Sequence, residues 1–292
     1  MSKWVIGVIG GSGLYDVDGF EDVDTMRIET PWGDPSDELT TGRIGDVHFV
    51  FLPRHGRGHR LTPTHVPYRA NIDALKRAGC TDVLSISACG SLRERYAPGD
   101  FVMVDQFIDR TISREKSFFG PGMVAHVSMA DPVCERLSQL AGDAAEKAGV
   151  TVHRSGTYLA MEGPQFSSRA ESFLYRQWEC DVIGMTNMPE AKLAREAELP
   201  YATMAMVTDY DCWRDATEAV SVANVLEIMQ SNTAAAKKAL TELAKLLSGV
   251  PRTNSPQAIE TCLDYALITA PDARDANLLA RLDAVAGRVL KT

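Results

Sequence analysis

The feature of this chain that most restricts its fold is the alternation of short β-rich runs with stretches of helical spacing. We expect strands at residues 4–9, 47–52, 82–87, 100–104, 157–161, 181–183 and 201–207. We expect helices at residues 68–78, 131–148, 168–178, 189–197 and 216–247. Strands that alternate with helices predict an α/β fold, a single domain with a central mixed β-sheet flanked by helices.

The chain changes character after the long helical stretch. Residues 248–256 contain Gly, Ser and Pro and are expected to form a linker, with two further helices at 259–267 and 276–290. The sequence therefore predicts a main domain over residues 1–247 and a linker with a C-terminal helical extension over 248–292. Residues 111–125, rich in Gly, Pro and aromatic side chains, are expected to form a mobile or intersubunit loop.

Composition excludes several classes of function. The 292 residues include 45% hydrophobic side chains and carry a formal net charge of −9, which argues against nucleic acid or an anionic membrane surface as partner. The sequence has no apolar run of about 18 residues, and its N-terminus does not resemble a signal peptide. The six cysteines form no CxxC pair and the six histidines show no metal-ligand spacing. We therefore expect a cytoplasmic protein with reduced thiols and no bound metal.

A glycine-rich turn, Gly-Gly-Ser-Gly at residues 10–13, follows the first expected strand. Backbone N–H groups and the Ser12 hydroxyl at the end of a strand suit a phosphate group. A dinucleotide site is weakly indicated, because Asp16 stands where its fingerprint has the third glycine. A tight turn that binds nothing is a further alternative.

Two further strand ends carry groups suited to the same anion. Arg54 and His55 follow the expected strand 47–52, and a guanidinium fork matches phosphate oxygens while the imidazole adds a donor. Ser87 and Ala88 offer a hydroxyl and an amide in a narrow space. Taken alone, a basic loop of this kind is more often a solvated surface. A close-packed strand end explains Ser87 and Ala88 as well as a binding site does.

Two carboxylates, Asp209 and Asp211, follow the expected strand 201–207. Strand periodicity would place both on the same side of the sheet. Two nearby carboxylates repel, so one of them tends to hold its proton. Such a pair can donate to N7 of a purine and accept from its amino group. A solvated loop and a metal site are the alternatives.

Two shorter stretches offer surfaces for an organic ligand. In residues 162–167, the Phe166 ring provides a flat face for a base and the Ser167 hydroxyl provides a hydrogen bond. Met185 and Thr186 close the expected strand 181–183. A methionine at such a position is more often part of a core than of a site.

Seven motifs lie in order between about residues 5 and 247: IGGSGLYD, PRHGRGH, ACGSLRE, DQFIDRT, EGPQFSSRAES, MTNMPEAKLA and TDYDCW. Together they resemble the trimeric purine nucleoside phosphorylase superfamily, and within it the enzymes that act on 5′-methylthioadenosine. The resemblance implies phosphorolysis of 5′-methylthioadenosine to adenine and 5-methylthioribose 1-phosphate, with residues 1–247 as the catalytic domain. It also implies a homotrimer with a shared active site, inorganic phosphate as co-substrate, and no cofactor.

The resemblance further implies a role for each candidate residue. Phosphate would bind at Ser12, Arg54, His55, Ser87, Ala88 and Thr186. The nucleoside would bind at Phe166, Ser167, Met185, Val222, Leu226 and, from a neighbouring subunit, His126. Asp209 would protonate N7 of the base, and Asp211 would accept from its 6-amino group.

The carboxylate pair favours a 6-amino purine, because a 6-oxo purine would set an acceptor against Asp211. A 6-oxopurine nucleoside or methylthioinosine phosphorylase is the nearest alternative. A hydrolase that attacks nucleosides with water and a non-catalytic nucleotide-binding or redox protein are alternatives from other classes. After Ser248 the sequence departs from the resembling enzymes, so the cover of the pocket for the 5′ group is not defined.

Overall fold

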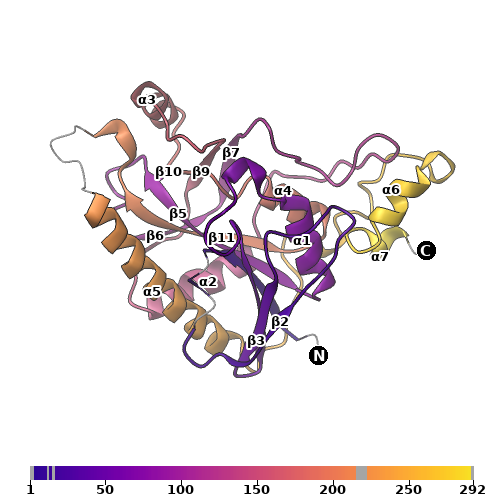
Figure 1. Cartoon of the computed structure of the whole chain (residues 1–292), viewed down its shortest axis with the longest axis horizontal. Helices are drawn as coiled ribbons and strands as arrows, with labels where there is room; N and C mark the ends of the chain where they lie inside the picture. The colour runs from indigo at the N-terminus through magenta and orange to yellow at the C-terminus, as the bar shows by residue number, and fades with distance from the viewer. Residues whose placement is uncertain (1–2, 12, 15–16, 215–221, 291–292) are drawn as a thin grey trace.

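The computed structural model describes residues 3–11, 13–14, 17–214 and 222–290, without the side chains of residues 222–226. In this part of the chain, eleven strands form one mixed sheet with helices on both faces (Figure 1). Eight strands follow the order β2-β3-β4-β1-β5-β10-β9-β7, while β11 pairs with β5 and β6, and β6 pairs with β8. The predicted fold class is therefore confirmed.

The strands are β1 (Val5–Gly10), β2 (Glu21–Met26), β3 (Leu39–Ile44), β4 (Val47–Pro53), β5 (Asp82–Ser91), β6 (Phe101–Val104), β7 (Gln106–Arg110), β8 (Val152–His153), β9 (Thr157–Met161), β10 (Val182–Gly184) and β11 (Tyr201–Asp209). The α-helices are α1 (Tyr68–Arg77), α2 (Glu135–Lys147), α3 (Arg169–Gln177), α4 (Glu190–Glu196), α5 (Val222–Leu247), α6 (Ala276–Arg281) and α7 (Gly287–Leu290). Single 3₁₀ turns include η2 (Asp211–Trp213) and η4 (Ile259–Thr261).

The centre of the sheet is parallel. Strand β1 pairs in parallel with β4 and β5, and β5 pairs in parallel with β11. The carboxyl ends of these four strands therefore meet at one edge of the sheet, which is where ligands bind in open α/β sheets. The second half of β5 also receives β10, which runs antiparallel to it.

Alternate residues of the central strands face two apolar cores on opposite faces of the sheet. Ile6 and Val8 of β1 belong to the core that includes residues of α2 and α5, such as Leu240. Ile9 belongs to the core on the other face, which includes Ile72 of α1 and residues of α4. This two-sided burial explains why the central strands have nearly continuous apolar sequences.

Several elements differ from the sequence prediction. Strands β2, β3, β7 and β8 were not predicted, and every residue of β2 is exposed, so that strand carries no apolar pattern. Helix α2 begins at Glu135 after Cys134, four residues later than the Asp-Pro pair at 131–132 indicated. The predicted helix 259–267 is wrong, because only the short turn η4 forms there. The predicted helix 276–290 is broken into α6 and α7.

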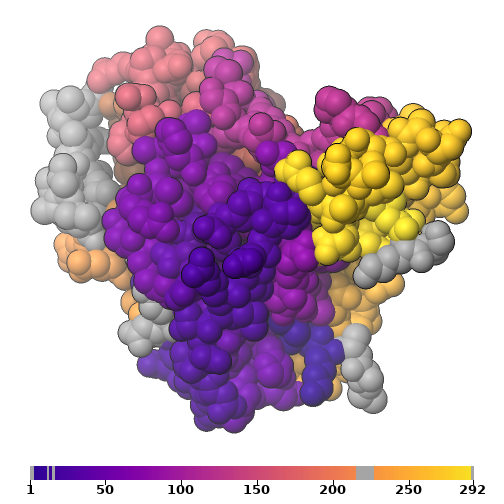
Figure 2. All heavy atoms as spheres, turned by 45° about the vertical axis from the view of Figure 1, so that its right-hand side comes forward, coloured from indigo at the N-terminus to yellow at the C-terminus, as the bar shows by residue number. Residues whose placement is uncertain are grey.

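The C-terminal segment packs on the face of the sheet that carries α1 and α4. Leu263, Leu282 and Val285 are buried in the core of that face. The segment forms the yellow edge of the molecule in Figure 2, next to the chain around residue 125. Ala125 and Leu267 form an isolated β-bridge there. The division of the chain at residue 247 stays a prediction.

The loop at residues 111–125 is anchored to the body of the protein. Phe118 and Met123 are buried in the same core as α1 and α4. Phe118 and Phe119, two of the aromatic side chains on which the loop prediction depended, are therefore part of the core. Among the described residues, no helix has the length and apolar character needed to cross a membrane.

Candidate functional site

The first two anion-binding motifs meet at the carboxyl ends of β1 and β4. Gly10 pairs with Pro53, and the backbone N–H of Arg54 donates to the Gly10 carbonyl oxygen at 2.9 Å. The basic loop therefore lies directly beside the glycine-rich turn, as the anion hypothesis requires. Ser12 lies outside the described residues.

Ser87 and Ala88 lie in β5, next to these two strand ends. The Ser87 side chain is buried, and its Oγ has no hydrogen-bond partner among the residues that the structure describes. Ala88 is exposed although it lies in the middle of the sheet, with buried residues on either side of it. A buried hydroxyl without a partner is costly, and it is available to a ligand that offers one. A ligand can therefore reach the sheet at Ala88.

Met185 and Thr186 follow β10 and lie against the same part of β5. A Cβ atom on Gly184, the last residue of β10, would come 3.4 Å from the Ala88 carbonyl oxygen. The buried Thr186 Oγ1 lies 3.3 Å from the hydroxyl of Tyr158. Burial raises the pKa of Tyr158 to about 12, so that hydroxyl keeps its proton at neutral pH. Five of the six predicted phosphate residues, all except Ser12, therefore lie at or beside neighbouring strand ends.

The guanidinium fork of Arg54 is occupied within the protein. Its Nε and Nη2 donate to the two carboxylate oxygens of Glu190, and Nη2 also donates to Ser85 Oγ at 2.6 Å. Tyr201 OH donates to the same carboxylate at 3.1 Å. Both members of the ion pair are buried. The sequence assigned this fork to phosphate, whereas in the structure it holds Glu190 at the start of α4.

Glu190 is a residue that the sequence analysis missed. Its only signal was a carboxylate at the start of an expected helix, close in sequence to Thr186. A buried arginine needs a partner of opposite charge, but that partner is 136 residues away in the chain.

His55 also differs from the donor that the sequence predicted. Its Nδ1 lies 2.9 Å from the Leu61 carbonyl oxygen, which can only accept, so Nδ1 carries a proton. Burial, together with the charge of Arg54, lowers the pKa of His55 to about 4. The neutral ring therefore presents Nε2 as an acceptor, and it stacks on His59 at 4.3 Å.

Asp209 and Asp211 lie together, but strand alternation does not place them. Strand β11 ends at Asp209, and Asp211 has φ +49°, which takes the chain out of the extended conformation. The Asp211 N–H donates to Asp209 Oδ1 at 2.8 Å, and the Thr208 hydroxyl donates to Asp209 Oδ2 at 2.7 Å. A Cβ on Gly90 would come 3.0 Å from Asp209 Oδ1, so the pair lies over β5. The expectation of a regular strand over both acids was wrong.

The Asp211 carboxyl has the properties of a proton-holding group. Burial raises its pKa, and the nearby charge of Asp209 raises it further, while the Ser172 hydroxyl on α3 lowers it. Asp211 Oδ2 is buried without a hydrogen-bond partner among the described residues. A ligand that supplies a hydrogen-bond partner would stabilise this oxygen.

The two residues predicted to meet a base lie beside this pair. The thiol of Cys212 donates to the Ser167 carbonyl oxygen at 3.4 Å, which brings the turn before α3 against η2. Ser167 Oγ donates to Met161 Sδ at 3.4 Å. The Phe166 side chain is 82% exposed, so its ring faces are free to stack on a ligand.

The remaining candidates are two apolar residues of α5 and His126. Val222 and Leu226 lie in the first turns of α5, and their side chains are outside the described part of the structure. His126 is exposed, and its backbone N–H donates to the Ala266 carbonyl oxygen at 2.9 Å. It thus belongs to the edge formed by the C-terminal segment, on the other side of the molecule from α3 in Figure 1.

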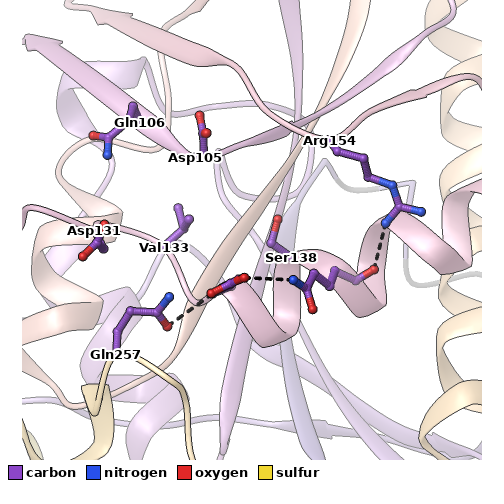
Figure 3. Close-up of a pocket in the computed structure, with 9 residues that line it drawn as sticks. Asp105, Gln106, Asp131, Val133, Ser138, Arg154 and Gln257 are labelled. Atoms are coloured by element: carbon purple, nitrogen blue, oxygen red, sulfur yellow. Dashed lines mark hydrogen bonds between the residues drawn. The ribbon is translucent and has the colours of Figure 1, made fainter.

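Two cavities in the described part of the chain lie elsewhere. One, of about 580 Å³, is lined by polar groups of α2 and its neighbours, including Asp131 and Arg154 (Figure 3). The other, of about 440 Å³, lies beside β2 and β3. Neither is lined by a candidate residue. The site is therefore located by its chemistry rather than by cavity size. Among the described residues, no three His, Cys, Asp or Glu side chains are grouped to hold a metal ion.

The chain is similar to known proteins in its sequence and in its fold. The model of the phosphorylase superfamily matches residues 5–245. The chain is similar to the S-methyl-5′-thioadenosine phosphorylase of Cereibacter sphaeroides, with 61% identity over 99% of both chains. It is also similar to the crystal structure of a methylthioadenosine phosphorylase from an Antarctic soil metagenomic library, with 46% identity, a TM-score of 0.91, and 98% and 99% of the two chains covered.

A further similar structure contains a ligand. It is a variant of the adenosine/methylthioadenosine phosphorylase of Schistosoma mansoni in complex with methylthioadenosine. The identity is 39% and the TM-score is 0.84, with 90% of this chain and 99% of that chain covered.

Proposed function

Since this chain belongs to the phosphorylase superfamily, and within it to the S-methyl-5′-thioadenosine phosphorylases, we propose that it splits 5′-methylthioadenosine with inorganic phosphate. The products are adenine and 5-methylthioribose 1-phosphate. The observation that carries the proposal is the meeting of two groups at adjacent strands. The Ser87 hydroxyl on β5 lacks a partner among the described residues, and the carboxyl pair Asp209 and Asp211 ends β11.

Phosphate is proposed to bind at the carboxyl ends of β1 and β4, beside Ser87 and Ala88 of β5. Its ligands would be Ser12, Ser87, Ala88 and Thr186, with the loop of Arg54 and His55. Arg54 supports the anion by holding this loop, because its guanidinium is bound to Glu190. The neutral His55 accepts from a protonated phosphate oxygen through Nε2. Positioning the nucleophile in this way removes much of the entropic barrier to attack at C1′.

The base is proposed to bind at the carboxyl pair. Cleavage of the glycosidic bond leaves a sugar with the character of an oxocarbenium ion, and a purine protonated at N7 departs as a neutral molecule. Asp209 donates to N7, and Asp211 accepts from the 6-amino group. The raised pKa of Asp211 supports a pair that retains one proton, and the proposed roles require that proton to lie on Asp209 once Asp211 accepts from the 6-amino group.

The rest of the nucleoside is proposed to lie between these two subsites. Met185 would contact the ribose, Phe166 would stack on the base, and Ser167 would bind its polar edge. The 5′-methylthio group would enter an apolar pocket formed by Val222 and Leu226. The chemistry requires only proton transfer and a bound phosphate, so we propose a reaction without metal or organic cofactor.

A homotrimer with a shared active site is part of the proposal, with His126 serving the site of a neighbouring subunit. Exposed apolar residues close to His126 support an interface there, namely Val124, Tyr265 and Ile268. We also propose a cytoplasmic location, which is supported by six free cysteines, four of them buried.

Base release from four nucleosides tests the function. The protein is incubated with 5′-methylthioadenosine, adenosine, inosine and methylthioinosine, each with and without phosphate. We expect release of adenine that depends on phosphate and is most efficient with 5′-methylthioadenosine. Release without phosphate would indicate a hydrolase, and a preference for inosine or methylthioinosine would indicate a 6-oxopurine enzyme. Either result would overturn the proposal.

Replacing Asp211 by Asn tests how the purine base is recognised. An amide can donate to a 6-oxo group, so we expect the ratio of kcat/KM for 5′-methylthioadenosine over methylthioinosine to fall by about 100-fold. Asp131→Asn, which changes a carboxylate of the cavity in Figure 3, is the control and should leave the ratio unchanged. An unchanged ratio in Asp211→Asn would remove Asp211 from base recognition.

A further inference from the structure

Arg114 lies in the loop at residues 111–125, and its side chain is completely buried. Its guanidinium donates five hydrogen bonds. The acceptors are Tyr68 OH at 2.9 Å, Met185 O at 2.8 Å, Met188 O at 2.6 Å, Met161 O at 3.3 Å and Glu162 O at 2.7 Å. Four of the five are backbone carbonyls, which is an uncommon environment for a buried cation.

These carbonyls belong to two segments that carry proposed site residues. Met185 and Met188 flank Thr186 after β10. Met161 ends β9 and Glu162 follows it, both ahead of Phe166. The parallel pairing of β9 with β10 ends at Ala160 and Gly184. The next carbonyls on each side, those of Met161 and Met185, are both bound by Arg114. The guanidinium thus continues the connection between the two segments where the β-ladder stops.

The two segments are also in close contact beyond the ladder. A Cβ on Gly163 would come 2.5 Å from Met185 Sδ, so the Met185 side chain packs directly on the backbone at Gly163. A small separation of the segments would therefore displace Met185, the residue proposed to contact the ribose.

The charge of Arg114 is balanced by a carboxylate that also closes the loop. Glu162 Oε1 lies 3.6 Å from Arg114 Nε and accepts from Thr64 Oγ1 at 2.5 Å. Its Oε2 accepts from the backbone N–H groups of Ile112 and Ser113. Burial acts to raise the pKa of Glu162, but these hydrogen bonds outweigh it and lower the pKa, so the group stays ionised.

We propose that Arg114 is a positioning residue of the active site. It sets the distance between the segment of Met185 and Thr186 and the turn that leads to Phe166. This inference rests on the proposed function, because it takes Met185 and Phe166 as nucleoside contacts. Arg114 acts through the backbone of these residues and does not itself touch the substrate.

Lysine in place of Arg114 tests this role. Arg114→Lys keeps the charge, but a single ammonium cannot span acceptors on both segments as a planar fork does. We expect KM for 5′-methylthioadenosine at saturating phosphate to rise about tenfold, with a smaller change in kcat, since a displacement of about 1 Å can cost up to 100-fold. Arg114→Gln, which also loses the charge, should raise KM further and serves as the second variant.

Phe118→Leu is the matched control, because Phe118 is buried in the same loop and packs on the Trp32 ring at 5.1 Å. Its truncation should lower the melting temperature while KM stays within about twofold of wild type. Wild-type protein that released no adenine would contradict the proposed function alone. With active wild type, the positioning role is refuted if Arg114→Lys leaves KM unchanged. It is equally refuted if KM rises in both loop variants in proportion to their loss of melting temperature.

Discussion

Asp211 combines three properties, each of which is uncommon for an aspartate. Its backbone is left-handed, its side chain is half-buried, and its buried Oδ2 lacks a hydrogen-bond partner among the described residues. Each property is unfavourable for folding, so they persist together only because the surrounding structure enforces them. At this position, the site is built at the expense of local stability. The nearby Asp209 is held differently, with both oxygens accepting hydrogen bonds from the protein.

The Ser172 hydroxyl adjusts the titration of this residue. It lowers the pKa of Asp211, so Ser172→Ala should raise that pKa further. The ionised carboxylate is the form that accepts from the 6-amino group. We therefore expect the acidic limb of the profile of kcat/KM against pH, for 5′-methylthioadenosine, to move to higher pH in the variant. Ser231→Ala, an exposed position on α5, is the control. A limb that stays in place or moves to lower pH would contradict the assignment.

The site residues that the sequence revealed are those whose chemistry is local. Ser87, Thr186 and Asp209 each follow an apolar run, which indicates a position in or after a buried strand. The structure places Thr186 after β10 and Asp209 at the end of β11, whereas Ser87 lies within β5. Glu190 and Arg114 are different, because their partners lie tens of residues away in the chain. Only folding brings those groups together, and no spacing rule indicates them.

Helices and strands were predicted well where the element is buried on both faces, or where its buried residues recur regularly along one face. The runs that became β4, β9 and β11 began at the expected residues, because an apolar run flanked by polar residues defines a buried strand. Strand β2 escaped prediction since it is fully exposed and depends on antiparallel pairing with β3. Helix α6 ends at Arg281, and Leu282 behind it is buried in the core. The helical spacing of the apolar residues predicted a continuous helix there, but tertiary packing of Leu282 ends it.

The loop at residues 111–125 is tied to helix α4 by a titratable group. Glu196 accepts from Ser117 Oγ and from the Phe118 N–H, each at 2.7 Å, and burial raises its pKa to about 7. The unfolded chain loses this proton near pH 4.5, whereas the folded protein keeps it to about pH 7. The stability contributed by Glu196 is therefore present below pH 4.5 and is lost as the pH rises to 7.

Glu196→Gln removes this titration. We expect the melting temperature of wild type, relative to that of the variant, to fall between pH 4.5 and 7 and to level off above. Thermal unfolding followed by circular dichroism at several pH values measures the difference. Asp272→Asn, on the 3₁₀ turn Pro271–Ala273, is the control. If the melting temperature of wild type rose relative to that of Glu196→Gln as the pH increased, the loop would stabilise the carboxylate form and the prediction would be wrong.

At the scale of the whole molecule, the C-terminal segment forms hydrogen bonds with the end of the loop of residues 111–125 at one edge of the protein. Val124 N–H donates to Thr269 Oγ1 at 2.9 Å, and the Ile268 N–H donates to the Val124 carbonyl oxygen at 2.9 Å. The same loop contains Arg114 at its other end. One continuous segment thus links the proposed subunit interface, through His126, to the proposed active site of the same chain.

The apolar residues at this edge allow a test of the assembly. Tyr265 is 97% exposed and Ile268 is 63% exposed, which suits a surface that another subunit covers. We expect Ile268→Asp to dissociate the trimer into monomers in analytical ultracentrifugation, because a buried carboxylate without a partner opposes association. Activity on 5′-methylthioadenosine should fall with it, as each site loses the His126 of its neighbour. Val23→Asp changes a side chain of similar exposure, 56%, on β2, and should preserve both trimer and activity. A trimer that survives Ile268→Asp would place the interface on another face of the molecule.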